Sequence, residues 1–152
     1  MHFFRKMFVG DTAEQQYLIY AEKEIVKILM KNPHINIVTY YHITDFYIDM
    51  ELLDTDSKLN CYEELISVKD FLQTLGIFYI DWKIDNIGKS IDNQFKLFDF
   101  NASGIIDIST QEWIVKPVET FWNYKKALEN GCKTPKEIDD WSFKYAFGLK
   151  IK

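Results

Sequence analysis

The residue pattern of this chain predicts an α+β domain, and three observations carry the prediction. Two segments, residues 12–31 and 65–75, repeat apolar side chains at the spacing of an amphipathic helix. Residues 46–53 alternate apolar and polar side chains, which is the period-two pattern of a half-buried strand. Residues 76–104 combine short apolar runs with closely spaced polar side chains, and this combination predicts strands joined by a polar loop.

The composition is that of one soluble globular domain. The chain has 152 residues, of which 47% are apolar and 27% charged, enough to bury a core. The formal net charge of −5 argues against a nucleic-acid-binding surface, which is usually basic. No run approaches the roughly 20 apolar residues of a membrane span, and the N-terminal residues lack the plan of a signal peptide. We therefore expect a cytoplasmic protein with no nucleic-acid partner and no membrane partner.

Residue usage also bears on source and compartment. The abundance of Ile, Lys, Asn, Phe and Tyr indicates an AT-rich coding genome, as in a virus, an intracellular parasite or an AT-rich bacterium. For a viral protein, the expected location is the host cytoplasm. Cys61 and Cys132 are far apart and lack metal-ligand spacing, which predicts two free thiols in a reducing compartment; the alternative is a single disulfide between them.

The N-terminal part predicts one strand followed by one helix. The segment 3–9 is short and rich in aromatic residues, as expected for a strand. Thr12 followed by Gln15 matches a capping box, so a helix is expected to begin there. That helix should run to about Lys31, because Pro33 cannot continue it.

The middle of the chain predicts two strands, a boundary and a second helix. The strands are expected at 35–42 and 46–53. The polar, turn-rich stretch 54–60 is the best candidate for a hinge. The amphipathic pattern of 65–75 predicts the helix, and Gly76 can end it by adopting a left-handed conformation.

Two more helices are expected towards the C-terminus. Residues 122–130 have helical character, and Gly131 ends this segment. Residues 133–138, KTPKEI, open a final helix. Its apolar face is expected at Phe143, Phe147 and Ile151.

The chemistry of the chain concentrates between residues 76 and 104. Asp81, Lys83 and Asn86 lie within six positions, and Asp99 ends an apolar run of strand-like character. Two carboxylates, an amide and an ammonium are what a metal–phosphate site needs, because Mg²⁺ prefers hard oxygen ligands and a lysine can neutralise a phosphoryl group. The alternative interpretation is a set of solvated loop residues between two strands.

The order of these residues resembles that of the protein kinase family. YIDWKIDN resembles the catalytic loop H-R-D-L-x-x-x-N, and LFDFN resembles the D-F-G segment that follows it. The resemblance implies that Asp81 is the catalytic base and Lys83 its phosphate partner. It also implies that Asn86 and Asp99 are the Mg²⁺ ligands, with ATP as the phosphate donor.

Three positions depart from the family pattern. Tyr79 stands for the histidine and keeps a ring that can pack beneath the D-F-N segment. Ile80 stands for the arginine, which removes the cation that pairs with a phosphorylated activation loop and implies constitutive activity. Asn101 stands for the glycine and is a mild change, because asparagine tolerates a positive φ better than most residues. By family analogy, Lys83 favours the Ser/Thr type.

The resemblance extends to both ends of the chain. It implies that Lys6 pairs with Glu24 to position the ATP phosphates, although a surface lysine on a terminal strand is the alternative for Lys6. The adenine contacts would come mainly from backbone groups around Glu51 and Leu53. The segment EIDDWSFKYAFGL resembles the start of the family's αF helix, with Asp139 as the structural aspartate that organises the catalytic loop.

The implied fold is a two-lobed, kinase-like α+β domain trimmed at both ends. Residues 1–53 would be a small lobe with a short antiparallel sheet and helix αC, and 54–60 the hinge. Residues 61–152 would be a partial, mainly helical large lobe, in which 102–120 are the activation segment. No G-x-G-x-x-G precedes Lys6, and no helices follow αF.

Two functions from different classes follow from this resemblance. The first is a minimal Ser/Thr protein kinase-like enzyme that transfers the ATP γ-phosphate to a protein hydroxyl. The second is a pseudokinase, a mimic that binds and regulates a full-length kinase or its substrate. A third, a small-molecule kinase, stays open. The trimming would leave a strand edge and an apolar helix surface exposed, and both could pair with a partner chain or with a second copy of this chain. A homo-oligomer is therefore one expected state.

Overall fold

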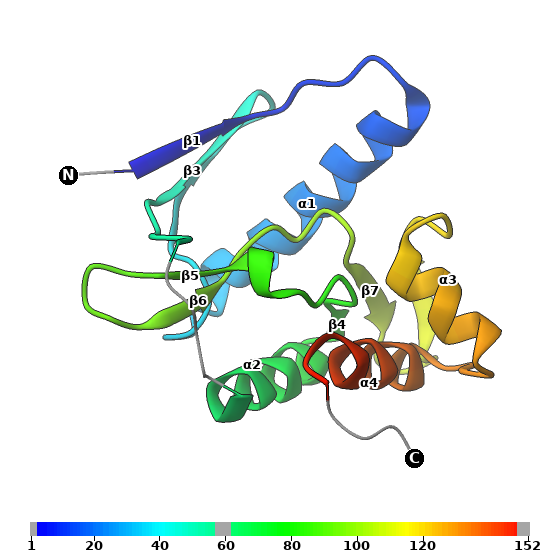
Figure 1. Cartoon of the computed structure of the whole chain (residues 1–152). Coiled ribbons are helices and arrows are strands. Elements are labelled where there is room, and N and C mark those ends of the chain that lie inside the picture. Colours follow the sequence, from blue (N-terminus) through cyan, green and yellow to red (C-terminus); the bar gives the residue numbers. More distant parts are fainter. Residues whose placement is uncertain (1–2, 57–61, 149–152) are drawn as a thin grey trace.

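The computed structural model describes residues 3–56 and 62–148, and Figure 1 shows how its helices and strands are arranged. Within these residues there are four α-helices and eight short strands, which confirms the α+β prediction. In chain order, the elements are β1 (Phe3–Met7), α1 (Ala13–Lys31), β2 (Tyr40–Ile43), β3 (Tyr47–Glu51), α2 (Tyr62–Thr74), β4 (Ile77–Phe78), a 3₁₀ turn (Ile84–Asn86), β5 (Ile87–Lys89), β6 (Phe95–Leu97), β7 (Gly104–Asp107), β8 (Glu112–Val115), α3 (Trp122–Glu129) and α4 (Pro135–Ala146).

The first sheet has the strand order β1–β3–β2, and both pairings are antiparallel. Its register places Phe3 opposite Glu51 and Arg5 opposite Asp49. The guanidinium group of Arg5 donates two hydrogen bonds to Asp49, from Nε to Oδ1 (2.7 Å) and from Nη2 to Oδ2 (2.9 Å). This fork pairs the carboxylate of a largely buried aspartate, so the sheet keeps a charged residue in its central strand.

The alternation predicted for β3 is only partly correct. Ile48 and Met50 are buried as expected. Phe46 and Leu52, predicted to share their face, are exposed because the strand is shorter than predicted and both lie beyond its ends. Asp49, predicted to face solvent, is buried because Arg5 covers and pairs it.

The strand predicted at 35–42 also begins later, at the start of β2. The residues before it pair elsewhere: Leu97 N donates to Asn36 O (2.9 Å), and Val38 N donates to Leu97 O (2.9 Å). These bonds join the connection between α1 and β2 to β6, and so tie the first sheet to the β5–β6 hairpin.

Helix α1 matches its prediction at both ends. Gln15 N donates to Thr12 Oγ1 (3.1 Å), and Thr12 N donates to Gln15 Oε1 (3.1 Å), which is the predicted capping box. The helix contacts β2 of the first sheet. Five of its residues are buried at helical spacing: Ala21, Glu22, Ile25, Val26 and Leu29. One of these five is a glutamate, which matters for the site.

Two smaller sheets follow α2. Strands β4, β7 and β8 form one, in that order, and β5 and β6 form the other. Gly76 ends the turn after α2 with φ +78°, as predicted, and its carbonyl accepts a hydrogen bond from Ile106 N on β7 (2.9 Å). Strands β7 and β8 lie within 102–120 and were not predicted from the sequence. Tyr17 Oη donates to Lys116 O (2.6 Å), which ties the chain just after β8 to α1.

The last two helices pack against each other, and α4 also contacts β4. Gly131 follows α3 with φ +88°, as its predicted terminator. Helix α4 opens with a capping box between Thr134 and Glu137, and Pro135 occupies its first turn. Helices α3 and α4 share a small apolar core with the β4–β7 region: Phe78, Ile80, Ile106, Tyr124, Ala127 and Ile138.

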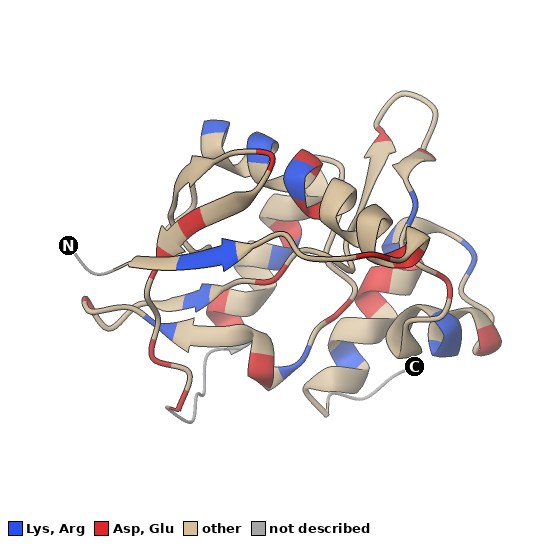
Figure 2. Cartoon of the chain, turned by 90° about the horizontal axis from the view of Figure 1, so that it is seen from above, with Lys and Arg blue, Asp and Glu red and all other residues tan. Residues whose placement is uncertain are grey.

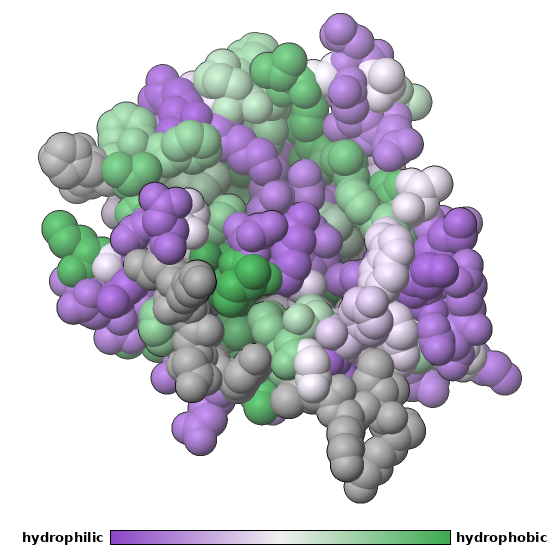
Figure 3. All heavy atoms as spheres, viewed as in Figure 1, coloured by the Kyte–Doolittle hydropathy of each residue, from purple (hydrophilic) through white to green (hydrophobic). Residues whose placement is uncertain are grey.

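Basic and acidic residues are interspersed over the ribbon (Figure 2). In the space-filling view, hydrophilic side chains gather near the centre of the face, between β1 and β3 above and α2 and α4 below (Figure 3). Among residues 3–56 and 62–148, no helix combines the length and the apolar character that crossing a bilayer requires.

Some predictions fall on residues outside the described ranges. These include residues 57–60 of the predicted hinge, Cys61, and Ile151 of the predicted apolar face. Cys132 is within the described chain and is a free thiol.

Candidate functional site

A strained loop after β4 carries Asp81. Tyr79, Ile80 and Trp82 are almost fully buried around it, while Asp81 itself is only half-buried. Ile80 has φ +65°, a left-handed conformation that β-branched residues rarely adopt. The buried neighbours therefore anchor the loop and leave the Asp81 carboxylate as the group that it presents.

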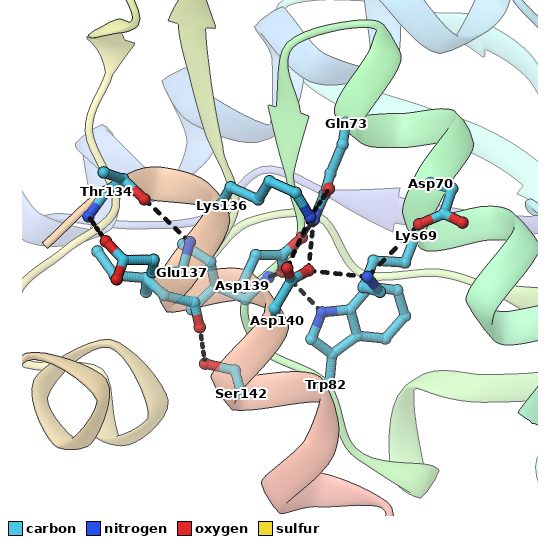
Figure 4. A network of polar contacts seen from close by, with 12 residues as sticks. Lys69, Asp70, Gln73, Trp82, Thr134, Lys136, Glu137, Asp139, Asp140 and Ser142 are labelled. Carbon is cyan, nitrogen blue, oxygen red and sulfur yellow. Dashed lines mark hydrogen bonds and ion pairs between the residues drawn. The ribbon is translucent and has the colours of Figure 1, made fainter. Parts of the chain in front are cut away.

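Asp139 on α4 holds this loop from the interior (Figure 4). Its Oδ1 accepts hydrogen bonds from Ile80 N (2.9 Å) and Trp82 Nε1 (2.7 Å), and its Oδ2 accepts one from Gln73 Nε2 (2.9 Å). Asp139 is completely buried, and burial raises the pKa of its carboxyl although these three donors oppose the rise. These bonds hold the backbone at Ile80 and the side chain of Trp82, the residues on either side of Asp81.

Asn86 and Lys83 lie beside Asp81. Asn86 Nδ2 donates to Asp81 O (3.0 Å) and to Asp81 Oδ2 (3.2 Å), and Lys83 Nζ is 3.8 Å from the same Oδ2. Burial raises the pKa of Asp81, and the charge of Asp99 adds to the rise, whereas Lys83 and Asn86 oppose it. A carboxyl with a raised pKa next to an amide and an ammonium is suited to accept a proton.

Asp99 forms a second cluster with Lys6 and Glu22. Lys6 Nζ is 2.9 Å from Glu22 Oε1 and 3.5 Å from Asp99 Oδ1. Burial disfavours the lysine charge, but both carboxylates outweigh it, so the pKa of Lys6 is raised. Glu22 is 2% exposed, and its burial raises the pKa of its own carboxyl although Lys6 opposes the rise.

The predicted pairing of Lys6 with Glu24 is wrong, because Glu22 is the partner. Glu24 lies on the outer side of α1, where its side chain is 39% exposed and 3.8 Å from Lys27. The two glutamates are two positions apart on a helix of 3.6 residues per turn, so they face nearly opposite directions. The sequence feature that could have predicted Glu22 is the apolar residue Val26. Residues four positions apart lie on the same face of a helix, and both Glu22 and Val26 are buried.

A cavity of about 410 Å³ lies beside the Lys6–Glu22–Asp99 cluster. It runs from that cluster to the end of β3 and the residues that follow. Its lining residues are Phe4, Lys6, Glu22, Met50, Glu51, Leu52, Leu53, Thr55, Phe98 and Asp99. One end of the cavity is therefore charged and the other is mostly apolar, which suits a ligand with a phosphate end and a flat apolar end.

Glu51 and Leu53 line this cavity, but the Glu51 carboxylate is engaged elsewhere. Its Oε1 pairs with Lys96 Nζ (2.8 Å) and accepts a hydrogen bond from Thr39 N (3.1 Å). Leu53 lies against β5, where a Cβ added to Gly88 would be 2.7 Å from Leu53 Cβ. A glycine on β5 thus lets the segment after β3 approach closely.

Asp99 and Asn86, the predicted metal ligands, lie on segments that are bonded to each other. Phe98 N donates to Asn86 O (3.0 Å), next to Asp99. Asp99 Oδ1 is buried and accepts no hydrogen bond from the described residues. The side chain of Asn86 donates to Asp81 through Nδ2, so its Oδ1 is the atom that could bind a metal. Among residues 3–56 and 62–148, no three His, Cys, Asp or Glu side chains form a metal-binding group. The donor set fits Mg²⁺, which needs only one or two protein oxygens when a phosphate supplies others.

Tyr79 joins the loop of Asp81 to the segment of Asp99. Its Oη donates to Phe98 O (2.5 Å), and its ring packs edge-to-face on Phe100 at 5.0 Å between centroids. The expectation that this ring packs against the D-F-N segment is therefore confirmed. Asp99 has φ +63°, so the contacts of Tyr79 support an uncommon backbone conformation.

The hydroxyl of Tyr40 carries a stability prediction. Tyr40 Oη is buried without a hydrogen-bond partner among the described residues, and burial together with the charges of Glu22 and Asp99 raises its pKa well above the ordinary value. Tyr40→Phe should leave the free energy of unfolding unchanged or raise it by up to about 1 kcal/mol, because it removes an unpaired polar group. Urea denaturation measures this change.

Tyr79→Phe is the matched control for that prediction. It removes a hydroxyl that donates to Phe98 O, so the free energy of unfolding should fall by about 1 kcal/mol. An equal loss in both variants would contradict the difference drawn between the two hydroxyls.

Comparison with known proteins provides one weak similarity. No protein-family model matches the sequence. The chain is 26% identical over 110 residues to "Probable serine/threonine-protein kinase RTK1" of Saccharomyces cerevisiae. The match covers 71% of this chain and 17% of the yeast protein. At this identity it hints at a relationship to kinases and supports no finer assignment.

Proposed function

We propose that the chain is a minimal kinase-like phosphotransferase, which binds ATP with Mg²⁺ in the 410 Å³ cavity and transfers the γ-phosphate to a serine or threonine hydroxyl of a protein substrate. The observation that carries the proposal is the cluster of Lys6, Glu22 and Asp99 at the charged end of that cavity. The weak similarity to a yeast kinase supports it independently.

The proposal includes a two-lobed arrangement. The β1–β3–β2 sheet and α1 would be the small lobe (residues 1–53), and α2 to α4 would belong to a partial large lobe (residues 61–152). Residues 54–60 would connect them as a hinge. Two contacts support a fixed geometry at this connection: the pairing of Asp54 with Lys89 (2.8 and 2.9 Å) and the ion pair of Glu51 with Lys96.

Each residue has a role that its contacts support. When bound, ATP supplies the phosphoryl group and Mg²⁺ neutralises its oxygens. Lys6 would hold the phosphate oxygens, and the buried Glu22 keeps the Lys6 ammonium aimed at the cavity. Asp99 Oδ1 and the side-chain Oδ1 of Asn86 would hold the metal.

Asp81 would accept the proton of the substrate hydroxyl as its oxygen bonds to the γ-phosphorus, while the bond from that phosphorus to the β–γ bridging oxygen breaks and ADP leaves with the electron pair. The raised pKa of Asp81 supports this role, because a stronger base accepts the proton more readily. Lys83, exposed and 3.8 Å from Asp81 Oδ2, would pair with the phosphoryl group as it moves.

A kinase mimic that binds a partner protein is the second candidate, and the edge of the first sheet favours it. Among the described strands, β1 pairs only with β3, so its other edge is unpaired. Phe3, Phe4 and Met7 on this strand are exposed. An apolar edge strand readily pairs with a strand of another chain, which could be a kinase, a kinase substrate or a second copy.

A thermal-shift experiment tests the proposed enzyme. ATP with Mg²⁺ at 100 times its Kd should stabilise the wild type by about 2.7 kcal/mol. Asp99→Ala should lose most of this gain, because it removes a metal ligand. Asp45→Ala is the control, since the Asp45 side chain is 91% exposed and neither Asp45 nor its ion-pair partner Lys23 lines the 410 Å³ cavity.

Two outcomes would overturn the proposal. The first is the lack of any shift at millimolar ATP, which would leave the partner-binding candidate. The second is phosphate transfer to a generic protein substrate that survives Asp81→Ala, because Asp81 would then not be the base.

A further inference from the structure

The left-handed conformation of Ile80 has to be held in place by residues outside the loop. A β-branched residue at φ +65° is strained, and such strain persists only where the surrounding structure holds it. Ile80 immediately precedes Asp81, so the direction of the Asp81 carboxylate depends on this one backbone conformation. The groups that hold Ile80 therefore also orient Asp81.

The first restraint comes from α4 and engages hydrogen-bond donors of the loop. Asp139 Oδ1 accepts from Ile80 N and from the indole Nε1 of Trp82. Asp139 does not contact the carbonyl groups of Ile80 and Trp82, and within the loop Ile80 O accepts a hydrogen bond from Trp82 N (2.8 Å).

The second restraint comes from α3 and engages those carbonyl groups. Asn123 Nδ2 donates to Ile80 O at 2.8 Å and approaches Trp82 O at 3.4 Å. Asn123 is half-buried on a different helix from Asp139, so the loop is held from two helices. Asn123 Nδ2 therefore contacts the carbonyl oxygens of Ile80 and Trp82, whereas Asp139 Oδ1 accepts from an N–H group of each of these two residues.

We propose that Asn123 is a positioning residue for Asp81, which holds the strained Ile80 peptide so that the carboxylate stays aimed at the substrate hydroxyl. This inference rests on the proposed function and deepens it. Asn123 does not line the cavity, so it acts on the transfer step and not on nucleotide binding. A base displaced by a fraction of its hydrogen-bond reach loses most of its effect.

Kinetics of phosphate transfer test this role through the split between kcat and KM. Asn123→Leu keeps a branched side chain without a donor and should lower kcat by about 10- to 100-fold. KM for ATP should stay within about twofold, since the cavity lining is unchanged. Asn123→Gln, which keeps an amide, should recover part of the rate. Asn130→Ala, at the C-cap of the same helix, is the control, because the Asn130 side chain donates to Lys126 O of α3 and not to the loop.

Hydrogen exchange gives a readout that does not require activity. In Asn123→Leu, exchange of the Asp81 amide and the Trp82 indole proton should accelerate, while exchange in α1 stays unchanged. Equal kinetics in Asn123→Leu and Asn130→Ala would overturn the inference, as would acceleration throughout the molecule or a rise in KM that accounts for the loss. If the wild type transfers no phosphate, the proposed function fails, and unchanged loop exchange in Asn123→Leu would reject the positioning role separately.

Discussion

Asp139→Ala is expected to lower the free energy of unfolding by about 3–5 kcal/mol, the largest effect of any single substitution considered for this chain. The carboxylate is completely buried and accepts hydrogen bonds from Ile80 N, Trp82 Nε1 and Gln73 Nε2. Alanine leaves the first two donors buried without a partner, and each unpaired donor costs about 1–3 kcal/mol. Urea denaturation monitored by tryptophan fluorescence measures the loss.

Asp140→Ala is the matched control, one residue further along α4. Its carboxylate lies nearer the surface and pairs with Lys69 (2.8 Å) and Lys136 (2.7 Å). Both ion pairs are partly solvated, and Lys69 keeps Asp70 at 3.5 Å, so the expected loss is about 1–2 kcal/mol, below that of Asp139→Ala. Similar losses in Asp139→Ala and Asp140→Ala would show that the loop does not depend on the buried carboxylate.

The pH dependence of Asp139→Asn checks the same contact with a definite sign. Burial raises the pKa of Asp139 in the folded protein above the ordinary value of about 3.9. Its stabilising contribution is therefore fully present below that value and is lost as pH rises through the folded pKa. The stability difference between the wild type and Asp139→Asn should accordingly favour the wild type most at low pH. Asp140 titrates with the opposite sign, because Lys136 and Lys69 overcome the effect of burial and lower its pKa.

The parts of the fold that the sequence predicted depend on residues close together in the chain. The capping box of Thr12 and Gln15 forms within one turn of helix, and the left-handed turn at Gly76 depends on one residue. Strands β7 and β8 could not be found this way. They are short, and Ile105 takes up its extended conformation because it pairs with β4 on one side and β8 on the other.

The same distinction divides the candidate site. Asp81 and Asn86 were found together because a single loop brings the amide of one to the carboxylate of the other. Glu22 was missed because the orientation of α1 depends on the sheet that it contacts. Asn123 was missed because it reaches the loop from 43 positions away, and no local pattern marks it.

Glu22→Ala and Glu24→Ala are expected to differ widely, and their comparison tests the corrected pairing. Glu22 is buried and bonded to Lys6, so its removal leaves the lysine with only Asp99 at 3.5 Å. Removing one partner of a buried ion pair costs about 3–5 kcal/mol. Because Lys6 is partly exposed and keeps Asp99, we expect a smaller loss of about 2–3 kcal/mol in the free energy of unfolding.

Glu24→Ala should change the free energy of unfolding by no more than about 0.5 kcal/mol, since the Glu24 side chain is 39% exposed and its ion pair with Lys27 is long, at 3.8 Å. The two variants remove the same side chain from the same helix, so helix propensity cancels in the comparison. Urea denaturation measures both losses, and ATP-induced stabilisation should fall in Glu22→Ala alone because only there is the Lys6 ammonium released. A larger effect from Glu24→Ala in either measurement would restore the pairing expected from the sequence and would require α1 to be rotated about its axis.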